Sequence, residues 1–149
     1  MGDVTHEQVN LMLRLYDARR EPLLREAREW YMSKFNPQSP EDMARLCPQG
    51  SKESAYMRMV ISYWDMACSL VVNNAIDEKM FNDANGEHLV VFGKIEGLIP
   101  AWREKMGDPN SWKNLETVAL GAPDARTRID GIKARIKAML AARAAAAKG

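Results

Sequence analysis

Side chains suited to acid–base chemistry are few in this chain. Histidine is the residue whose ordinary pKa suits proton transfer near pH 7, and the sequence has two, His6 and His88. His6 falls on the first turn of an N-terminal helix, where fraying is common. His88 follows Glu87 at a helix start, where packing at the helix end is the ordinary role and contact with a ligand is the alternative. The sequence has no Glu-x-x-His, no His-Glu-x-x-His, no paired Cys-x-x-Cys and no glycine-rich phosphate loop. We therefore expect no catalytic residue and no bound cofactor, and we incline to a protein that is not an enzyme.

A polar, turn-rich elbow at residues 73–88 carries acidic side chains that suit a ligand. The segment Asp83–His88 has the composition of a calcium loop, but its glycine comes two positions too early and position twelve is Lys94, which cannot coordinate a cation. An EF-hand loop is therefore excluded. A small-ligand or metal site around residues 77–88 remains the alternative function, built from the elbow and one carboxylate of the preceding helix: Asp65, Asp77, Glu78, Asp83, Glu87 and His88.

Asp65 falls on an apolar stripe of the predicted central helix, between Ile61 and Cys68. A carboxylate buried there needs a partner. Arg20 has the same position on the first helix, between Tyr16 and Leu23, and is the first candidate. A structural ion pair or an exposed edge position is the more common role of such residues, and a carboxylate that binds a ligand is the alternative.

The elements that must position these residues are all helices. Apolar residues recur at spacings of three and four, and no stretch alternates for long enough to form a strand. We expect a single-domain bundle of about five to seven helices around a long central helix near residues 52–73. A first helix over about 6–35 keeps its phase across Pro22, so a kinked continuous helix is preferred to two abutting ones. The other helices are expected near residues 40–46, 77–84, 87–106 with a bend at Pro100, 108–120, and 123–146.

Charge is unevenly distributed. Residues 1–121 hold 14 Lys and Arg against 18 Asp and Glu, whereas residues 122–149 hold 7 against 2. We therefore divide the chain into a helical body, residues 1–121, and a basic amphipathic C-terminal helix, residues 122–149, packed on the body or projecting from it. The candidate interaction surface consists of three basic residues of this helix and one tryptophan of the body: Arg128, Arg135, Lys137 and Trp112.

Residues 63–108 carry a series of motifs: Tyr-Trp-Asp-Met-Ala at 63–67, Val-Asn-Asn-Ala-Ile-Asp-Glu at 72–78, then Phe81, Asn-Gly-Glu at 85–87, and Ile-Glu-Gly-Leu-Ile-Pro at 95–100 leading to Arg103. This segment resembles a family of small helical bacterial proteins classified as a domain of unknown function, some of which have an N-terminal membrane anchor. The resemblance implies an all-helical domain. It implies no activity, cofactor or catalytic residue, and we expect this chain to differ from the anchored members in having no such anchor.

These observations favour a cytoplasmic protein that works by binding another protein or a second copy of itself, as in a homodimer. Wide apolar stripes and an alanine-rich last helix suit contacts between helices. Two cysteines without Cys-x-x-Cys spacing favour free thiols in a reducing compartment, and no apolar run is long enough for membrane insertion. Contact of the basic helix with nucleic acid or anionic lipid is a further alternative. Nucleic-acid binding is the weaker alternative to protein binding, because no aromatic residues are interleaved with the basic ones and no recognition helix of a known motif is apparent.

Overall fold

The computed structural model describes residues 2–149, and the secondary structure of this range is helical throughout, with no strand. The all-helical prediction is confirmed. In chain order the helices are α1 (His6–Arg19), α2 (Pro22–Lys34), α3 (Pro40–Leu46), α4 (Lys52–Val72), α5 (Glu78–Ala84), α6 (Glu87–Ile95), the 3-10 helix η1 (Glu96–Leu98), α7 (Ile99–Met106), α8 (Lys113–Gly121) and α9 (Ala125–Ala147).

Two long helices expected from the sequence are divided in the structure. The preference for one kinked helix across Pro22 is wrong: α1 ends at Arg19, and α2 begins anew at Pro22 with the Glu21 carboxylate accepting a hydrogen bond from Leu24 N. Proline has no N–H and its ring clashes with the carbonyl four residues earlier, so it suits the first turn of a new helix better than the middle of an old one. The expected helix 87–106 divides for the same reason into α6, η1 and α7, with Pro100 in the first turn of α7.

The helix expected from Asp108 begins five residues later, at Lys113. Residues 108–112 form turns instead, in which the Asp108 carboxylate accepts a hydrogen bond from Asn110 N, and Trp112 adopts a left-handed backbone conformation with φ of 60°. Short polar side chains bond readily to the backbone two residues ahead, which competes with helix formation.

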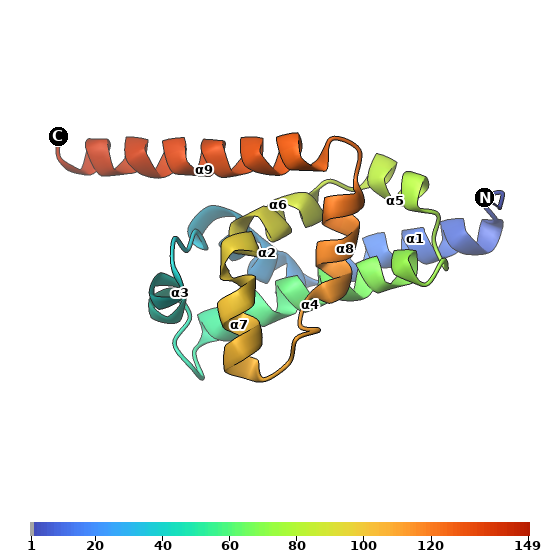
Figure 1. The fold of residues 1–149 in the computed structure, drawn as a ribbon, viewed down its shortest axis with the longest axis horizontal. Helices are drawn as coiled ribbons and strands as arrows, with labels where there is room; N and C mark the ends of the chain where they lie inside the picture. Colours follow the sequence, from blue (N-terminus) through green and yellow to red (C-terminus); the bar gives the residue numbers. More distant parts are fainter. Residues whose placement is uncertain (1) are drawn as a thin grey trace.

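Helix α4 is the centre of the bundle. It lies between α2 and α8, and α6 packs against α4, α8 and α9 (Figure 1). Burial on two sides explains why α4 carries an apolar stripe wider than one helix face. Its buried side chains are Tyr56, Met57, Val60, Ile61, Tyr63, Trp64, Ala67, Cys68 and Val71.

The two terminal helices are the least buried. Helix α1 buries none of its residues, and α9 lies across α6 and then extends past the body (Figure 1). The first half of α9 belongs to the core, because Ala125, Ile129 and Ile132 are buried and Ile132 packs closely over Gly93 of α6. Residues 141–149 are exposed throughout. No helix within residues 2–149 combines the length and the apolar character needed to cross a membrane.

Candidate functional site

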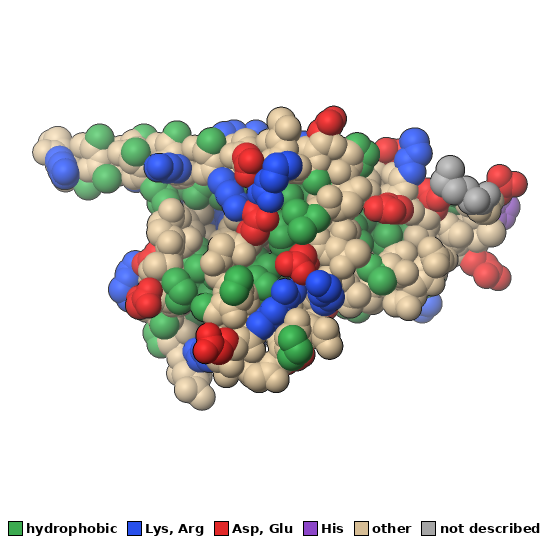
Figure 2. Space-filling view, in the orientation of Figure 1, with side chains coloured by type: hydrophobic (Ala, Val, Ile, Leu, Met, Phe, Trp, Pro, Cys, Tyr) green, Lys and Arg blue, Asp and Glu red, His purple; other side chains and the backbone are tan. Residues whose placement is uncertain are grey.

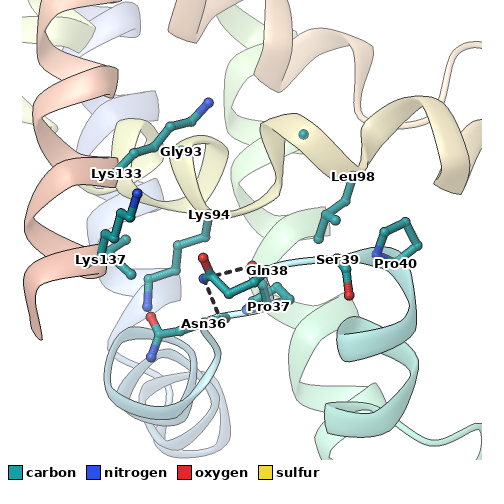
Figure 3. A pocket seen from close by; sticks show the side chains of 12 residues that line it. Asn36, Pro37, Gln38, Ser39, Pro40, Gly93, Lys94, Leu98, Lys133 and Lys137 are labelled. Atoms are coloured by element: carbon teal, nitrogen blue, oxygen red, sulfur yellow. Dashed lines mark hydrogen bonds between the residues drawn. The ribbon is translucent and has the colours of Figure 1, made fainter. Parts of the chain in front are cut away.

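A cleft of about 350 Å³ opens where the loop after α2, the α6–η1 junction and α9 meet. Three lysines, one from α6 and two from α9, lie at one end of it, and Leu98 and Pro40 lie at the other (Figure 3). No acidic side chain belongs to its wall. The wall is formed by Asn36, Pro37, Gln38, Ser39, Pro40, Gly93, Lys94, Gly97, Leu98, Lys133, Ile136 and Lys137. We name this hollow the basic cleft.

Lys94 is the deepest cation of the basic cleft, with only 8% of its surface exposed. Its ammonium group donates hydrogen bonds to the carbonyl oxygens of Tyr31, at 2.7 Å, and Met32, at 2.9 Å. These carbonyls belong to the last turn of α2, where backbone acceptors lack partners in the helix and a cation is favoured by the helix dipole. Two of the three ammonium protons are thus used by the fold, and no carboxylate pairs with Lys94 anywhere in residues 2–149.

The charge on Lys94 is held at a cost. Burial, and to a smaller extent the neighbouring cation Arg143 of α9, lowers the pKa of its ammonium group to about 8. Burial in low dielectric disfavours the charged form of an amine. An anion in the basic cleft would oppose both effects, since it would supply the negative charge that the surrounding side chains lack.

Asn36 adds a second unusual group. Its side chain is 7% exposed, and its carbonyl oxygen Oδ1 is buried with no hydrogen-bond partner among the described residues. The loop that carries it is tied in place, because the Gln38 amide donates to the backbone carbonyls of Asn36 and Pro37 at 3.0 and 3.2 Å (Figure 3). Buried polar atoms are nearly always paired in proteins, so an exception in the wall of a cleft points to a ligand atom.

The two α9 lysines differ in their partners. Lys133 is paired with Glu96, which also holds Arg126 through two bonds of 2.7 Å, and these cations lower the pKa of the Glu96 carboxyl to about 2. Lys137 is exposed and forms no ion pair within the described chain. Figure 2 shows Lys and Arg side chains spaced along α9. Lys137 is therefore available to an anion that reaches the basic cleft from solvent.

Comparison with known families identifies the domain that forms most of this cleft. The model of a family described as "Domain of unknown function (DUF4760)" matches residues 4–121. The chain belongs to this family. The match confirms the resemblance to a family of unknown function and extends well beyond residues 63–108. No curated protein and no solved structure matches the chain. The DUF4760 domain supplies the Asn36 loop and Lys94, whereas Lys133 and Lys137 come from α9, beyond the matched residues.

Sequence reasoning missed the basic cleft of this DUF4760 protein, although one signal was present. Lys94 is a single cation within the apolar run from Leu89 to Ile95, on a helix whose residues from His88 onward are all buried or nearly so. A charge in such a run is a candidate for a special role. Asn36 gave no signal, because its burial depends on α6 and α9, which lie far away in sequence.

The predicted elbow site does not assemble in the DUF4760 domain. His88 is fully buried between the rings of Trp64 and Phe81, with ring centroids 5.8 and 5.0 Å away. Its Nε2 lies 3.2 Å from Asn82 Oδ1, and its Nδ1 has no partner. Burial, and to a smaller extent the charge of Arg128, lowers the pKa of its imidazole to about 4. His88 is therefore a neutral core residue, in agreement with the packing role.

The acidic residues of the elbow have separate structural roles. Glu87 binds Arg28 through two bonds of 2.9 Å and accepts a third from the Trp64 indole at 2.7 Å. Asp77 caps α5, as expected, by accepting a hydrogen bond from Met80 N. Within residues 2–149 no three His, Cys, Asp or Glu side chains are grouped so that they could hold a metal ion. Glu87 of α6 thus joins α2 and α4 in a structural network of an ion pair and a hydrogen bond.

The proposed pair of Asp65 and Arg20 is also absent. Asp65 is half-buried and accepts a hydrogen bond of 2.9 Å from Leu115 N in the first turn of α8. It supplies the cap that α8 lacks, because Trp112 at the N-cap position offers no acceptor. Arg20 is exposed, and its guanidinium lies 5.5 Å from the centre of the Tyr16 ring. A donor for Asp65 was expected, but the wrong one was chosen.

The predicted interaction surface is distributed over separate places. Lys137 lines the basic cleft, whereas Arg128 and Arg135 line a shallow hollow of α6 and α9 with Gly86 and Gly131. Trp112 is half-buried and stacks on Trp102, with ring centroids 4.6 Å apart. These four residues therefore form no single patch.

Proposed function

We propose that this protein binds a small anionic molecule in the basic cleft. The observation that carries the proposal is Lys94, a buried ammonium group without a carboxylate partner, in a cleft whose charged wall residues are all lysines. Two carbonyl groups of α2 accept hydrogen bonds from Lys94, but no carboxylate neutralises its charge, so an anion in the basic cleft would gain a charge-assisted hydrogen bond. The unpartnered Asn36 Oδ1 supports the same conclusion, because it offers a buried acceptor to a ligand donor.

Phosphate-type anions suit this cleft best. A phosphate group carries up to two charges and three acceptor oxygens, which suits the remaining proton of Lys94 together with the unpaired ammonium group of Lys137, while Lys133 stays paired with Glu96. The cleft of about 350 Å³ is at the small end of ligand pockets.

The test is a titration with inorganic phosphate, read by the melting temperature and by calorimetry. A ligand at 100 times its dissociation constant should stabilise the parent by about 2.7 kcal/mol. Lys94→Met should abolish the effect, whereas the control Lys148→Met should retain it, since Lys148 is exposed at the end of α9 and lies outside the cleft wall. If Lys94→Met does not fold, Lys137→Met serves instead. Equal stabilisation of the cleft variants and the parent would refute the proposal.

Self-association is the second candidate function, and one observation favours it. Helix α1 exposes Val9, Leu13 and Tyr16, at spacings of four and three, on a face that covers nothing in the described chain. This spacing is that of a helix-pairing seam. Asp3 and Glu7 precede the seam, and Arg19 and Arg20 follow it beside Asp17 and Glu21, so an antiparallel second copy would bring the two leading acids near the two arginines.

Sedimentation equilibrium tests this second candidate. Leu13→Glu should convert a dimer to a monomer, whereas Leu120→Glu, at an exposed leucine of α8, should leave the dimer intact. A monomeric parent at all concentrations would refute it. A reducing, cytoplasmic location is proposed with both candidates, because Cys47 and Cys68 are free thiols.

A further inference from the structure

An apolar groove lies beside the basic cleft, on its far side from α9. It has a volume of about 490 Å³ and is bounded by α3, α4 and α7. Methionine and tryptophan side chains form much of its wall, namely Met43, Met57, Met106 and Trp102. Flexible thioethers adapt their shape to a flexible apolar chain. The only charged residues that line it are Arg58 and Lys105.

The groove and the basic cleft are neighbours with a common wall. Pro40 and Leu98 line both hollows. In the basic cleft these two residues lie at the end away from the lysines (Figure 3). A molecule that extends from the lysines past Leu98 therefore reaches the thioethers and the Trp102 ring of the groove. An anionic head and an apolar chain would suit these two places.

We infer that the two hollows form one site for a single-chain phospholipid of the lysophosphatidate class, with its phosphate among the lysines and its acyl chain in the apolar groove. The inference rests on the proposed function and names the ligand class. Both ends of this molecule have counterparts in the wall. The phosphate meets Lys94 and Lys137, and the acyl chain covers the methionines and Trp102.

The chain should contribute most of the affinity. Burial of one methylene group improves binding about fourfold. Even a few buried methylenes should therefore make an acylated glycerol phosphate bind far more tightly than glycerol phosphate alone. Arg58 and Lys105 do not hinder an alkyl chain, since long basic side chains can cover apolar surface with their stems while their charged ends stay in water.

Calorimetry with lysophosphatidate carrying a 12-carbon chain, kept below its micelle concentration, tests the inference against two probes. Glycerol 3-phosphate has the head without the chain, and dodecyl maltoside has the chain without the charge. The parent should bind the lysophosphatidate at least ten times more tightly than either probe. Lys94→Met should weaken binding of both phosphates at least tenfold, and Lys137→Met replaces it if that variant does not fold.

A groove variant separates the chain from the head. Ala101→Phe places a ring in the groove wall and should weaken only the acylated ligand, while Glu104→Phe, at an exposed position of α7 that does not line the groove, should change neither. Equal affinity for lysophosphatidate and glycerol 3-phosphate would overturn the inference and leave the proposed function intact. Binding of neither phosphate, or binding unaffected by the lysine variants, would overturn both.

Discussion

The neutral, buried His88 should make this protein sensitive to acid. The folded chain keeps the His88 pKa at about 4, because the imidazole is buried against Trp64 and Phe81, and Arg128 repels its charged form. In the unfolded chain the imidazole has its ordinary pKa of 6.5. Between pH 6.5 and pH 4 the unfolded state therefore binds more protons than the folded state. The contribution of neutral His88 to the unfolding free energy is complete above pH 6.5 and falls as the pH drops toward 4. The difference corresponds to about 3 kcal/mol of unfolding free energy at pH 4.

Urea denaturation at pH 7, 6, 5 and 4, followed by circular dichroism, measures this loss. The substitution His88→Phe keeps an aromatic ring in the core but cannot bind a proton, so its unfolding free energy should fall about 3 kcal/mol less than that of the parent between pH 7 and pH 4. His6→Gln is the matched control, since His6 is exposed on α1, and it should follow the parent. The Glu96 carboxyl loses its stabilising contribution as the pH falls from its ordinary pKa of 4.5 to its folded pKa of about 2. This loss is the same in the parent, His88→Phe and His6→Gln, so it cancels when their unfolding free energies are compared.

The result that refutes this reasoning is a parallel fall in the parent and His88→Phe. The proton would then be taken up without cost, which requires that His88 be accessible to solvent or that a carboxylate lie beside its unpartnered Nδ1. Direct titration by nuclear magnetic resonance gives an independent check, because the imidazole signal of His88 should not shift between pH 7 and pH 5.

Three further predictions concern stability. Asp65→Ala should lower the free energy of unfolding by about 1 kcal/mol, because it removes the cap of α8. Asp65→Asn keeps an acceptor and should retain much of this stability. An unchanged urea midpoint for the alanine variant would exclude the capping role. Arg28→Met should cost about 2 kcal/mol because it leaves Glu87 half-buried without its cation, whereas the exposed control Arg25→Met should have little effect. Deletion of residues 141–149 should change the unfolding free energy by less than about 0.5 kcal/mol; a large fall in melting temperature would place the tail in the core.

Local sequence signals were sufficient for most of the helices. The central helix 52–73 and the short helix capped by Asp77 were predicted within a residue or so of their observed bounds. Both depend on interactions within one turn, namely a capping side chain and an apolar period. The break at Pro22 also has a local cause, but the apolar stripe keeps its phase across it, and this hid the fact that the chain turns there.

The partners of the polar residues were decided by tertiary structure. Asp65 was correctly expected to need a donor, but Leu115 N lies 50 positions away, and Glu87 finds Arg28 59 positions away. Helical periodicity predicts which side of a helix is apolar. It does not predict which other helix covers that side, or how that helix is rotated about its own axis. Many side chains can satisfy one carboxylate, so the sequence leaves the choice open until the helices pack.

The candidate site shows most clearly the difference between what the local sequence determines and what tertiary packing determines. Composition and periodicity determined that the chain is helical and that its C-terminal segment is basic. Only the packing of α9 across α6, together with the loop after α2, brings Lys94, Lys137 and Asn36 into one cleft. A helix or a cap forms from neighbours along the chain, whereas a binding site requires that distant segments pack at fixed distances, and burial then sets the charge state and hydrogen-bonding needs of the groups between them.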